Sequence, residues 1–274
     1  MIHRIVTCLK KVTLAAALLA PLTAPALAAP CGNDASGFDA WLRDIRQAAM
    51  AQGISANALR ALDGVTYDTR VISLDRNQKH FKVSLEEFMR NRVSGGRISK
   101  GRQMLKTYAA TLQRIEQRFG VPGPILVAIW GMETDYGANI GKMPILRSLA
   151  TLSYDCRRSA FFTGQFFDAL RIYQRGDLTL DEMRGAWAGE IGQTQFLPSS
   201  YVKFAVDFDG DGRADLVRSA PDVLASTANY LRGYGWRAGA GWAPGQPNYQ
   251  ALLGWNKAEV YAQALGIFAG KLTQ

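Results

Sequence analysis

Residues 121–137 read VPGPILVAIWGMETDYG, and this stretch does most to determine the fold. A proline near its start and a glycine at its end are typical of helix boundaries. The residues between them are apolar on nearly every side, which predicts a helix at the centre of a hydrophobic core. One carboxylate, Glu133, stands in the last turn of that helix. Its position needs a chemical explanation, because a buried charge is costly.

The helical period of 3.6 residues recurs along most of the chain. Residues 36–49 and 104–119 carry apolar stripes, and Gly120 is placed to end the second. Further helices are expected at about 157–174, 179–187, 198–206, 221–233 and 256–270. Alternating strand patterns are limited to short runs near 215–218 and 248–253. We therefore expect a mainly α fold (α+β) with minor β structure.

The composition is that of a globular protein with a large core. The chain has 274 residues, of which 48% are hydrophobic and 20% charged, and this excludes a disordered chain. Three cysteines are too few for a small disulfide scaffold. The length allows one or two domains of about 150 residues each. A net charge of +9 favours an anionic partner.

Residues 1–28 have the pattern of an export signal. Basic residues precede an apolar stretch, and Ala26 and Ala28 form a small-x-small cleavage site. The stretch stops at Pro21 and is shorter than the ~20 residues of a spanning helix, so a retained anchor is the alternative. No cysteine follows a lipobox. We expect an exported, periplasmic protein with a cleaved signal peptide and no membrane span.

Signal cleavage would change both the charge and the cysteine count. It removes three basic residues and no acidic ones, which leaves a net charge of +6, and it removes Cys8. Cys31 and Cys156 then remain as an even pair in an oxidising compartment, which predicts a disulfide between them. The alternative is two unpaired buried thiols. We expect an anionic extracytoplasmic polymer as partner and no nucleic acid, for which the chain has no recognisable motif.

The placement of Glu133 predicts acid chemistry. An apolar pocket and the negative end of the helix dipole should both raise the pKa of its carboxyl. A carboxyl that stays protonated can donate a proton to a glycosidic oxygen. The alternative is a glutamate that points to solvent or pairs with an arginine. Most glycosidases need a second carboxyl; Glu190 is the candidate by motif, whereas Asp135 belongs on another face of the helix.

Residues 207–215, DFDGDGRAD, contain the pattern D-x-D-x-D-G. This pattern resembles the first half of an EF-hand loop, in which carboxylates bind Ca²⁺ and glycine allows the sharp turn. Three neighbouring acids repel one another unless a cation joins them. Arg218 stands where an EF-hand has its closing glutamate. The alternative is a tight turn that binds no metal.

Several motifs in order resemble the lytic murein transglycosylases of the B type, glycoside hydrolase family 103. They are AIWGMETDYG at 128–137, ATLS at 150–153, RR at 157–158 and AGEIGQTQFLPSSY at 188–201. The similarity extends from about residue 36 to the C-terminus. It implies a lysozyme-like helical domain that cleaves the bond from N-acetylmuramic acid to N-acetylglucosamine in peptidoglycan strands. The products would carry 1,6-anhydromuramoyl ends, with Glu133 as the single catalytic acid and base and no cofactor in the chemistry.

The resemblance also implies a set of residues that bind the glycan: Arg157, Arg158, Gln195, Tyr230, Asn256 and Tyr261. The two arginines would meet carboxylates of peptide stems, which planar guanidinium groups recognise well. Trp255 replaces a tyrosine of the family's type member and could stack on a sugar.

In the same family an enlarged calcium loop is closed by a later aspartate. The resemblance therefore implies a structural Ca²⁺ held by Asp207, Asp209, Asp211, the Arg213 carbonyl and Asp222. We expect this loop to be an insertion at about 205–222 within a single catalytic domain, 29–274, and the protein to be a monomer. Two alternatives remain: a hydrolytic muramidase with Glu190 or Asp135 as base, and a non-catalytic peptidoglycan-binding module.

Overall fold

The computed structural model describes residues 30–78 and 83–274, so the expected signal peptide lies outside the described residues. Most of the described chain is helical: α1 (Phe38–Ala51), α2 (Ala56–Leu59), α3 (Thr69–Arg76), α4 (Leu85–Arg92), α5 (Gly95–Thr107), α6 (Ala109–Phe119), α7 (Gly123–Thr134), α8 (Ile145–Tyr154), α9 (Ser159–Arg175), α10 (Pro198–Phe204), α11 (Ala220–Gly233), α12 (Tyr249–Trp255) and α13 (Glu259–Leu272). Two 3₁₀ turns, η1 (Ala35–Gly37) and η2 (Arg60–Leu62), and one antiparallel pair, β1 (Met143–Pro144) with β2 (Arg184–Gly185), complete these elements. The expectation of a mainly α fold is confirmed.

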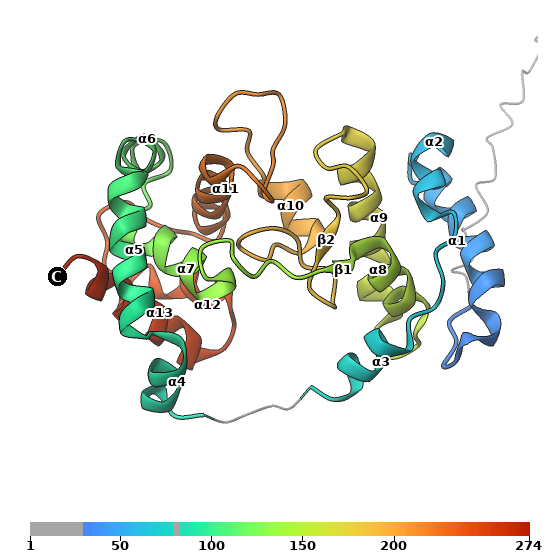
Figure 1. Ribbon diagram of the computed structural model, residues 1–274, viewed down its shortest axis with the longest axis horizontal. Helices are drawn as coiled ribbons and strands as arrows, with labels where there is room; N and C mark the ends of the chain where they lie inside the picture. The colour runs from blue at the N-terminus through green and yellow to red at the C-terminus, as the bar shows by residue number, and fades with distance from the viewer. Residues whose placement is uncertain (1–29, 79–82) are drawn as a thin grey trace, which may run out of the picture.

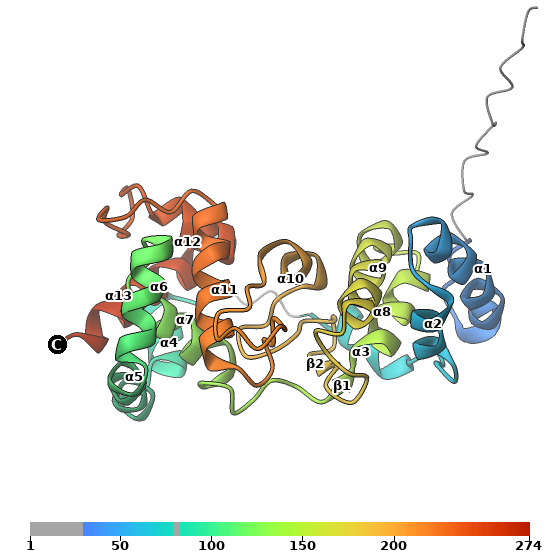
Figure 2. The same cartoon turned by 90° about the horizontal axis from the view of Figure 1, so that it is seen from above.

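The helices form an elongated molecule with two lobes (Figures 1 and 2). Helices α1, α2, α3, α8 and α9 make one lobe, and α4 to α7 with α11 to α13 make the other. The strand pair and α10 lie between the lobes. Each lobe therefore contains segments that are distant in sequence, and one continuous hydrophobic core runs through both. No helix among residues 30–78 and 83–274 is long and apolar enough to cross a membrane.

Helix α7 lies at the centre of its lobe, as its sequence predicts. It packs against α5, α6, α11 and α13, and ten of its twelve residues are buried. The helix ends because Asp135 and Tyr136 adopt left-handed backbone angles, with φ of 55° and 61°. The Tyr136 ring folds back onto Gly131, where an added Cβ would lie 2.7 Å from it. This turn leaves Glu133 one residue before the end of the helix.

The disulfide expected between Cys31 and Cys156 is present, with the Cα atoms 5.0 Å apart. Beside it, the Gly32 amide donates a hydrogen bond to the carbonyl of Tyr154 at 3.0 Å. An added Cβ on Gly32 would overlap the Tyr154 ring, so only glycine fits there. The start of the described chain is therefore fixed to the turn between α8 and α9.

Three local predictions are wrong. Residues 179–187 do not form a helix: the Thr179 amide does bond the Glu182 carboxylate at 2.8 Å, but the chain then enters β2. Residues 215–218 form a turn rather than a strand, because the Asp215 side chain accepts two backbone N–H groups there. The expected strand near 248–253 is helix α12.

Candidate active site

A cavity of about 590 Å³ opens beside the C-terminal end of α7. Its wall is made by α4, α7, the segment 186–200, α11 and the junction of α12 with α13. The lining residues are Phe88, Arg92, Met132, Glu133, Ala186, Glu190, Thr194, Gln195, Phe196, Leu197, Ser200, Tyr230, Trp255, Asn256, Ala258 and Tyr261. The fold therefore assembles this wall from segments spread over about 170 residues of sequence.

Glu133 is one of two carboxyl groups that line this cavity. Its Oε1 atom accepts hydrogen bonds from the Tyr261 hydroxyl at 2.5 Å and from the Trp255 indole N–H at 2.9 Å. Both donors come from the C-terminal part of the chain. No described residue donates to the other oxygen, Oε2, so that oxygen is available to a ligand.

The surroundings of Glu133 favour its protonated form. Burial raises the pKa of the carboxyl above its usual value. The hydrogen bonds from Tyr261 and Trp255 and the positive charge of Arg92 act in the opposite direction, but burial outweighs them. The direction is the one that the apolar sequence around Glu133 predicts. A carboxyl of raised pKa can give up a proton to a ligand and later accept one.

Gln195, Tyr230 and Asn256 line the same cavity as Tyr261, as the resemblance implies. Gln195 has a left-handed φ of 56°, and its amide nitrogen donates to the carbonyls of Ile140 and Gly192. This leaves the Gln195 side-chain oxygen to accept a hydrogen bond from a ligand.

Two of these cavity residues also organise the protein around them. The Tyr230 hydroxyl donates to the Gly254 carbonyl at 2.9 Å, which holds α12 against α11. The Asn256 side chain accepts from the Ala258 amide at 3.0 Å, just before α13. Both contacts help to fix the wall that carries Trp255.

The other glutamine of the motif, Gln193, is a structural residue. It is buried, accepts from the Trp130 indole at 2.8 Å and donates to the Val217 carbonyl at 2.9 Å. Its own carbonyl accepts from the Thr134 hydroxyl at 2.5 Å. Its side chain and backbone therefore join α7 to the loop before α11.

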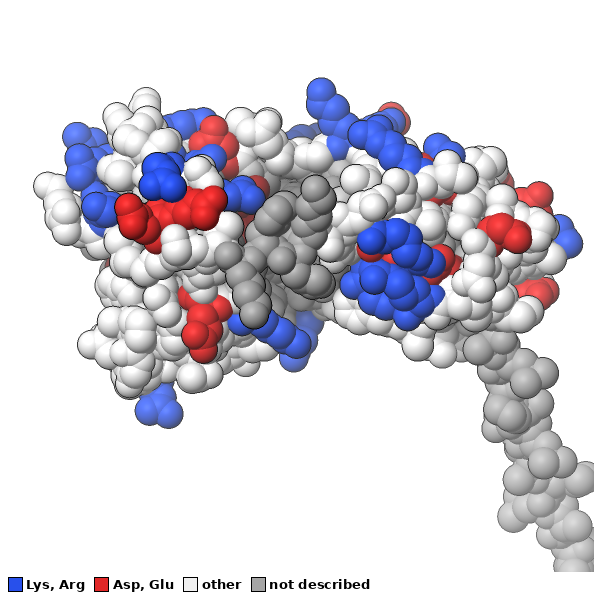
Figure 3. Space-filling model, turned by 90° about the horizontal axis from the view of Figure 1, so that it is seen from below, with Lys and Arg blue, Asp and Glu red and all other residues white. Residues whose placement is uncertain are grey.

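Arg157 and Arg158 are not among the residues that line the cavity. Both bind the buried Asp75 of α3, Arg157 through Nε at 2.8 Å and Nη2 at 2.6 Å. Arg76 joins them and also bonds Asp155 at 2.6 Å. Figure 3 shows basic side chains gathered on the lobe that contains α3 and α9. Asp75 thus holds both guanidinium groups, which stay 41% and 39% exposed. Their binding of peptide-stem carboxylates stays a prediction.

The two carboxyls considered as a second catalytic group lie in different places. Asp135 pairs with Arg97, with 3.3 Å between Oδ1 and Nε, and does not line the cavity. Glu190 does line it, together with Glu133. The Glu190 Oε2 atom is buried and has no hydrogen-bond partner among the described residues.

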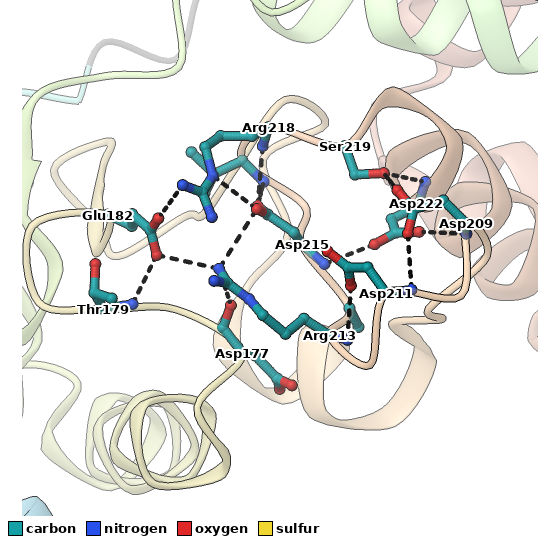
Figure 4. Close-up of polar contacts among 12 residues, drawn as sticks. Asp177, Thr179, Glu182, Asp209, Asp211, Arg213, Asp215, Arg218, Ser219 and Asp222 are labelled. Atoms are coloured by element: carbon teal, nitrogen blue, oxygen red, sulfur yellow. Dashed lines mark hydrogen bonds and ion pairs between the residues drawn. The ribbon is translucent and has the colours of Figure 1, made fainter.

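The acidic loop brings three carboxylates together, and Figure 4 labels two of them, Asp209 and Asp211. Oxygen atoms of Asp207, Asp209 and Asp211 lie within 4.8 Å of one another. Asp207 accepts from the amides of Gly210 at 2.7 Å and Gly212 at 2.9 Å, so the loop curls around its carboxylate. Hard oxygen donors at this spacing fit Ca²⁺.

Asp222 does not complete this set. Its Oδ1 accepts from the amides of Phe208 and Asp209, and its Oδ2 accepts from the amide of Asp215. The Asp222 side chain is fully buried and holds the loop backbone through these hydrogen bonds. Asp222 thus lies outside the cluster of three carboxylates, and its role as a metal ligand stays a prediction.

Two contributions to the cavity were not expected from the sequence. Helix α4 supplies Phe88 and Arg92 to the cavity wall. Trp255 was expected to stack on a sugar, but its N–H donates to Glu133. Neither contact has a local signal, because each joins residues far apart in the chain.

Comparisons with known proteins agree with this geometry. The family model for the transglycosylase SLT domain matches residues 37–246. Membrane-bound lytic murein transglycosylase B of Escherichia coli (strain K12) is 37% identical over 164 residues, which cover 57% of this chain and 45% of that protein. The chain thus spans less than half the length of this curated relative.

Solved structures extend the similarity to most of the chain. SltB3 of Pseudomonas aeruginosa, in complex with NAG-anhNAM-pentapeptide, superposes with a TM-score of 0.83 and 33% identity over 87% of this chain and 80% of that one. Escherichia coli Slt35 in complex with calcium gives a TM-score of 0.76 and 25% identity over 89% and 96%. The expected lysozyme-like helical fold is confirmed, and the chain belongs to the transglycosylase SLT domain family.

Proposed function

We propose that this protein is a lytic transglycosylase that cleaves peptidoglycan between N-acetylmuramic acid and N-acetylglucosamine. The observation that supports this most directly is Glu133: a carboxyl of raised pKa, at a cavity, with one oxygen bonded by Tyr261 and Trp255 and the other open. The relative SltB3 was solved with an anhydromuramoyl peptide. That ligand is of the product class that the proposed reaction forms.

Glu133 acts twice in the proposed reaction. Its protonated Oε2 gives a proton to the glycosidic oxygen while the bond from that oxygen to C1 of the muramoyl unit breaks. The resulting carboxylate takes the proton from the C6 hydroxyl of the same unit, and the C6 oxygen bonds to C1. The proton is returned to Glu133, and no water is consumed. Tyr261 and Trp255 stabilise the intermediate carboxylate through Oε1.

A hydrolytic muramidase is the competing enzyme. It needs an ionised base that activates water on the far side of the sugar. Asp135 lies outside the cavity in a pair with Arg97. Burial raises the pKa of Glu190, and a negative charge on Glu133 would raise it further. This favours the neutral form of Glu190, and a neutral carboxyl cannot accept a proton. These observations favour the anhydro-forming reaction, for which one carboxyl is sufficient.

We also propose a structural Ca²⁺ at the acidic loop. Asp207, Asp209 and Asp211 would supply three ligands, and the Arg213 carbonyl remains the fourth in the proposal. The ion would balance three like charges and hold the loop that leads from α10 to α11. Because α11 carries Tyr230 into the cavity, the ion would act on the site only through the fold. The peptidoglycan chemistry would need no cofactor.

The cellular setting follows from the sequence and stays part of the proposal. An exported, periplasmic monomer made of a single catalytic domain, 29–274, would meet peptidoglycan directly. Positive charge on the protein would attract the carboxylates of its peptide stems. A non-catalytic peptidoglycan-binding module remains the alternative, and it would not need an acid of raised pKa.

The test is the turnover of purified peptidoglycan by Glu133→Gln. Removing a general acid and base should lower the rate by at least about 10³-fold, while Gln keeps the size of the side chain and an acceptor for Tyr261. Glu116→Gln on the exposed face of α6 is the matched control and should keep the wild-type rate. A binding module would show no turnover in any of the three proteins. Full activity of Glu133→Gln would reject the assigned role.

A further inference from the structure

Glu190 is the second carboxyl of the cavity, and the proposed reaction does not use it. The side chain lines the same space as Glu133. Its Oε2 atom is buried and has no hydrogen-bond partner among residues 30–78 and 83–274. Leaving a buried polar atom without a partner costs about 1–3 kcal/mol, so such an atom at a ligand cavity calls for a partner in the bound state.

The backbone around Glu190 holds the side chain at the cavity wall. The Glu190 carbonyl accepts from the Ala186 amide at 3.1 Å, which closes a tight turn. The next residue, Ile191, exchanges two hydrogen bonds with Phe196 at 2.8 and 2.9 Å. Gly185 packs so closely that an added Cβ would lie 1.9 Å from the Glu190 carbonyl oxygen. These contacts hold the backbone of Glu190 in place, which is required of a residue that orients a ligand.

The electrostatic environment favours the uncharged form of this carboxyl. Burial is the main cause that raises its pKa, and whenever Glu133 is ionised its negative charge raises the pKa of Glu190 further. The amides of Glu190 and Ala188 and the charge of Arg158 act in the opposite direction and are outweighed. A protonated carboxyl carries an O–H donor, whereas an ionised one can only accept. The hydroxyl and N-acetyl carbonyl oxygens of an uncharged sugar are matching acceptors.

We propose that Glu190 is a positioning residue whose protonated carboxyl donates a hydrogen bond to a hydroxyl or N-acetyl oxygen of the glycan in the cavity. The proposal rests on the proposed function, because it takes an N-acetylated glycan as the ligand. Glu190 fixes the sugar relative to Glu133 and takes no part in proton transfer. The role explains how two carboxyls share one cavity without charge repulsion: one transfers protons and the other stays neutral.

Two variants with side chains about as long as glutamate test whether the ligand needs a hydrogen-bond donor or a negative charge at position 190. Glu190→Gln keeps a donor in an uncharged side chain, and Glu190→Met keeps the length but has no donor. Each is assayed for peptidoglycan turnover and, by calorimetry at pH 7, for binding of a β-1,4-linked trimer of N-acetylglucosamine. Glu116→Met on the exposed face of α6 is the matched control. Melting curves check folding, and Glu190→Ala replaces the Met variant if that variant does not fold.

Loss of one hydrogen bond in Glu190→Met should raise KM and weaken trimer binding by about 5- to 10-fold, with kcat within about twofold. Glu190→Gln should keep KM and the affinity for the trimer within about twofold of wild type. A Gln variant as weak as the Met variant would show that the charge is needed and would overturn the proposal. Wild-type binding by the Met variant would overturn it as well. If the wild type binds the trimer but cleaves no peptidoglycan, the proposed function fails while the binding data still decide the role of Glu190.

Discussion

Replacing Asp75 by asparagine should destabilise the protein strongly, because this buried carboxylate joins three arginines. Asp75 is 2% exposed and accepts from Arg76 at 2.7 Å, from Arg157 at 2.8 and 2.6 Å, and from Arg158. Asparagine keeps one acceptor, places an NH₂ group against guanidinium donors and removes the charge. The contact also joins α3 to the start of α9, so its loss should loosen the whole lobe.

The expected cost is a few kcal/mol. A hydrogen bond to a charged group contributes about 1.5–3 kcal/mol, and several are lost here. The arginines are 38–41% exposed, so solvent screening reduces the sum, and about 2–4 kcal/mol is expected. For a chain of this size that corresponds to a fall in Tm of roughly 5–12 °C. The exposed pair Arg46–Asp63 is the control, since Asp63→Asn should cost less than about 1 kcal/mol.

The pH dependence of the stability difference between wild type and Asp75→Asn shows whether the charge of Asp75 causes that difference. Burial alone raises the pKa of the Asp75 carboxyl, but the hydrogen bonds and charges of Arg157 and Arg158 outweigh it, and the net pKa is lowered. A carboxyl with a lowered pKa stabilises the folded state above its unfolded pKa of about 3.9 and loses that effect as the pH falls through the folded pKa. The difference between wild type and Asp75→Asn, measured by denaturant unfolding, should therefore be full at pH 7 and shrink below about pH 4. An equal difference at pH 7 and pH 3 would refute the electrostatic argument.

Three further predictions concern other parts of the molecule. Tyr261→Phe removes a donor to the Glu133 carboxylate, so the pKa of Glu133 should rise and the alkaline limb of the kcat/KM profile should move to higher pH; movement to lower pH would contradict this. A chelator should lower Tm, and added Ca²⁺ should restore it. At a free Ca²⁺ concentration of 100 times Kd, the bound ion should stabilise the folded state by about 2.7 kcal/mol. An unchanged Tm would argue against metal at the acidic loop. Cys31→Ser, or reduction of the disulfide with Cys156, should cost about 2–5 kcal/mol in denaturant unfolding, and equal stability of the oxidised and reduced protein would count against this contribution.

Features with a local cause could be predicted from the sequence. The apolar run of α7 predicted a buried helix, and Gly120 ends α6 in the left-handed conformation expected of a helix C-terminus, with φ of 72°. Glu133 stood out because a carboxylate interrupts that apolar run. The pairing of Cys31 with Cys156 followed from the even cysteine count that signal cleavage would leave, and it is confirmed.

Features that depend on distant partners could not be predicted. The segment 179–187 carries a helix-capping pattern, but Arg213 and Arg218 bind the Glu182 carboxylate and the chain turns into β2 instead. Arg157 resembled a cleft residue, and only the fold shows Asp75 beside it. Such contacts join residues tens of positions apart, and no local periodicity carries that information.

The most direct test of the central claim is the mass of the muropeptides released from purified peptidoglycan. If Glu133 serves as both acid and base and water takes no part, the cleaved muramoyl ends should be 1,6-anhydro forms, one water lighter than reducing ends. Glu133→Gln should release neither form. Reducing muramic acid ends from the wild-type protein would contradict the account, since they would show that water, activated by another base, attacks the muramoyl carbon.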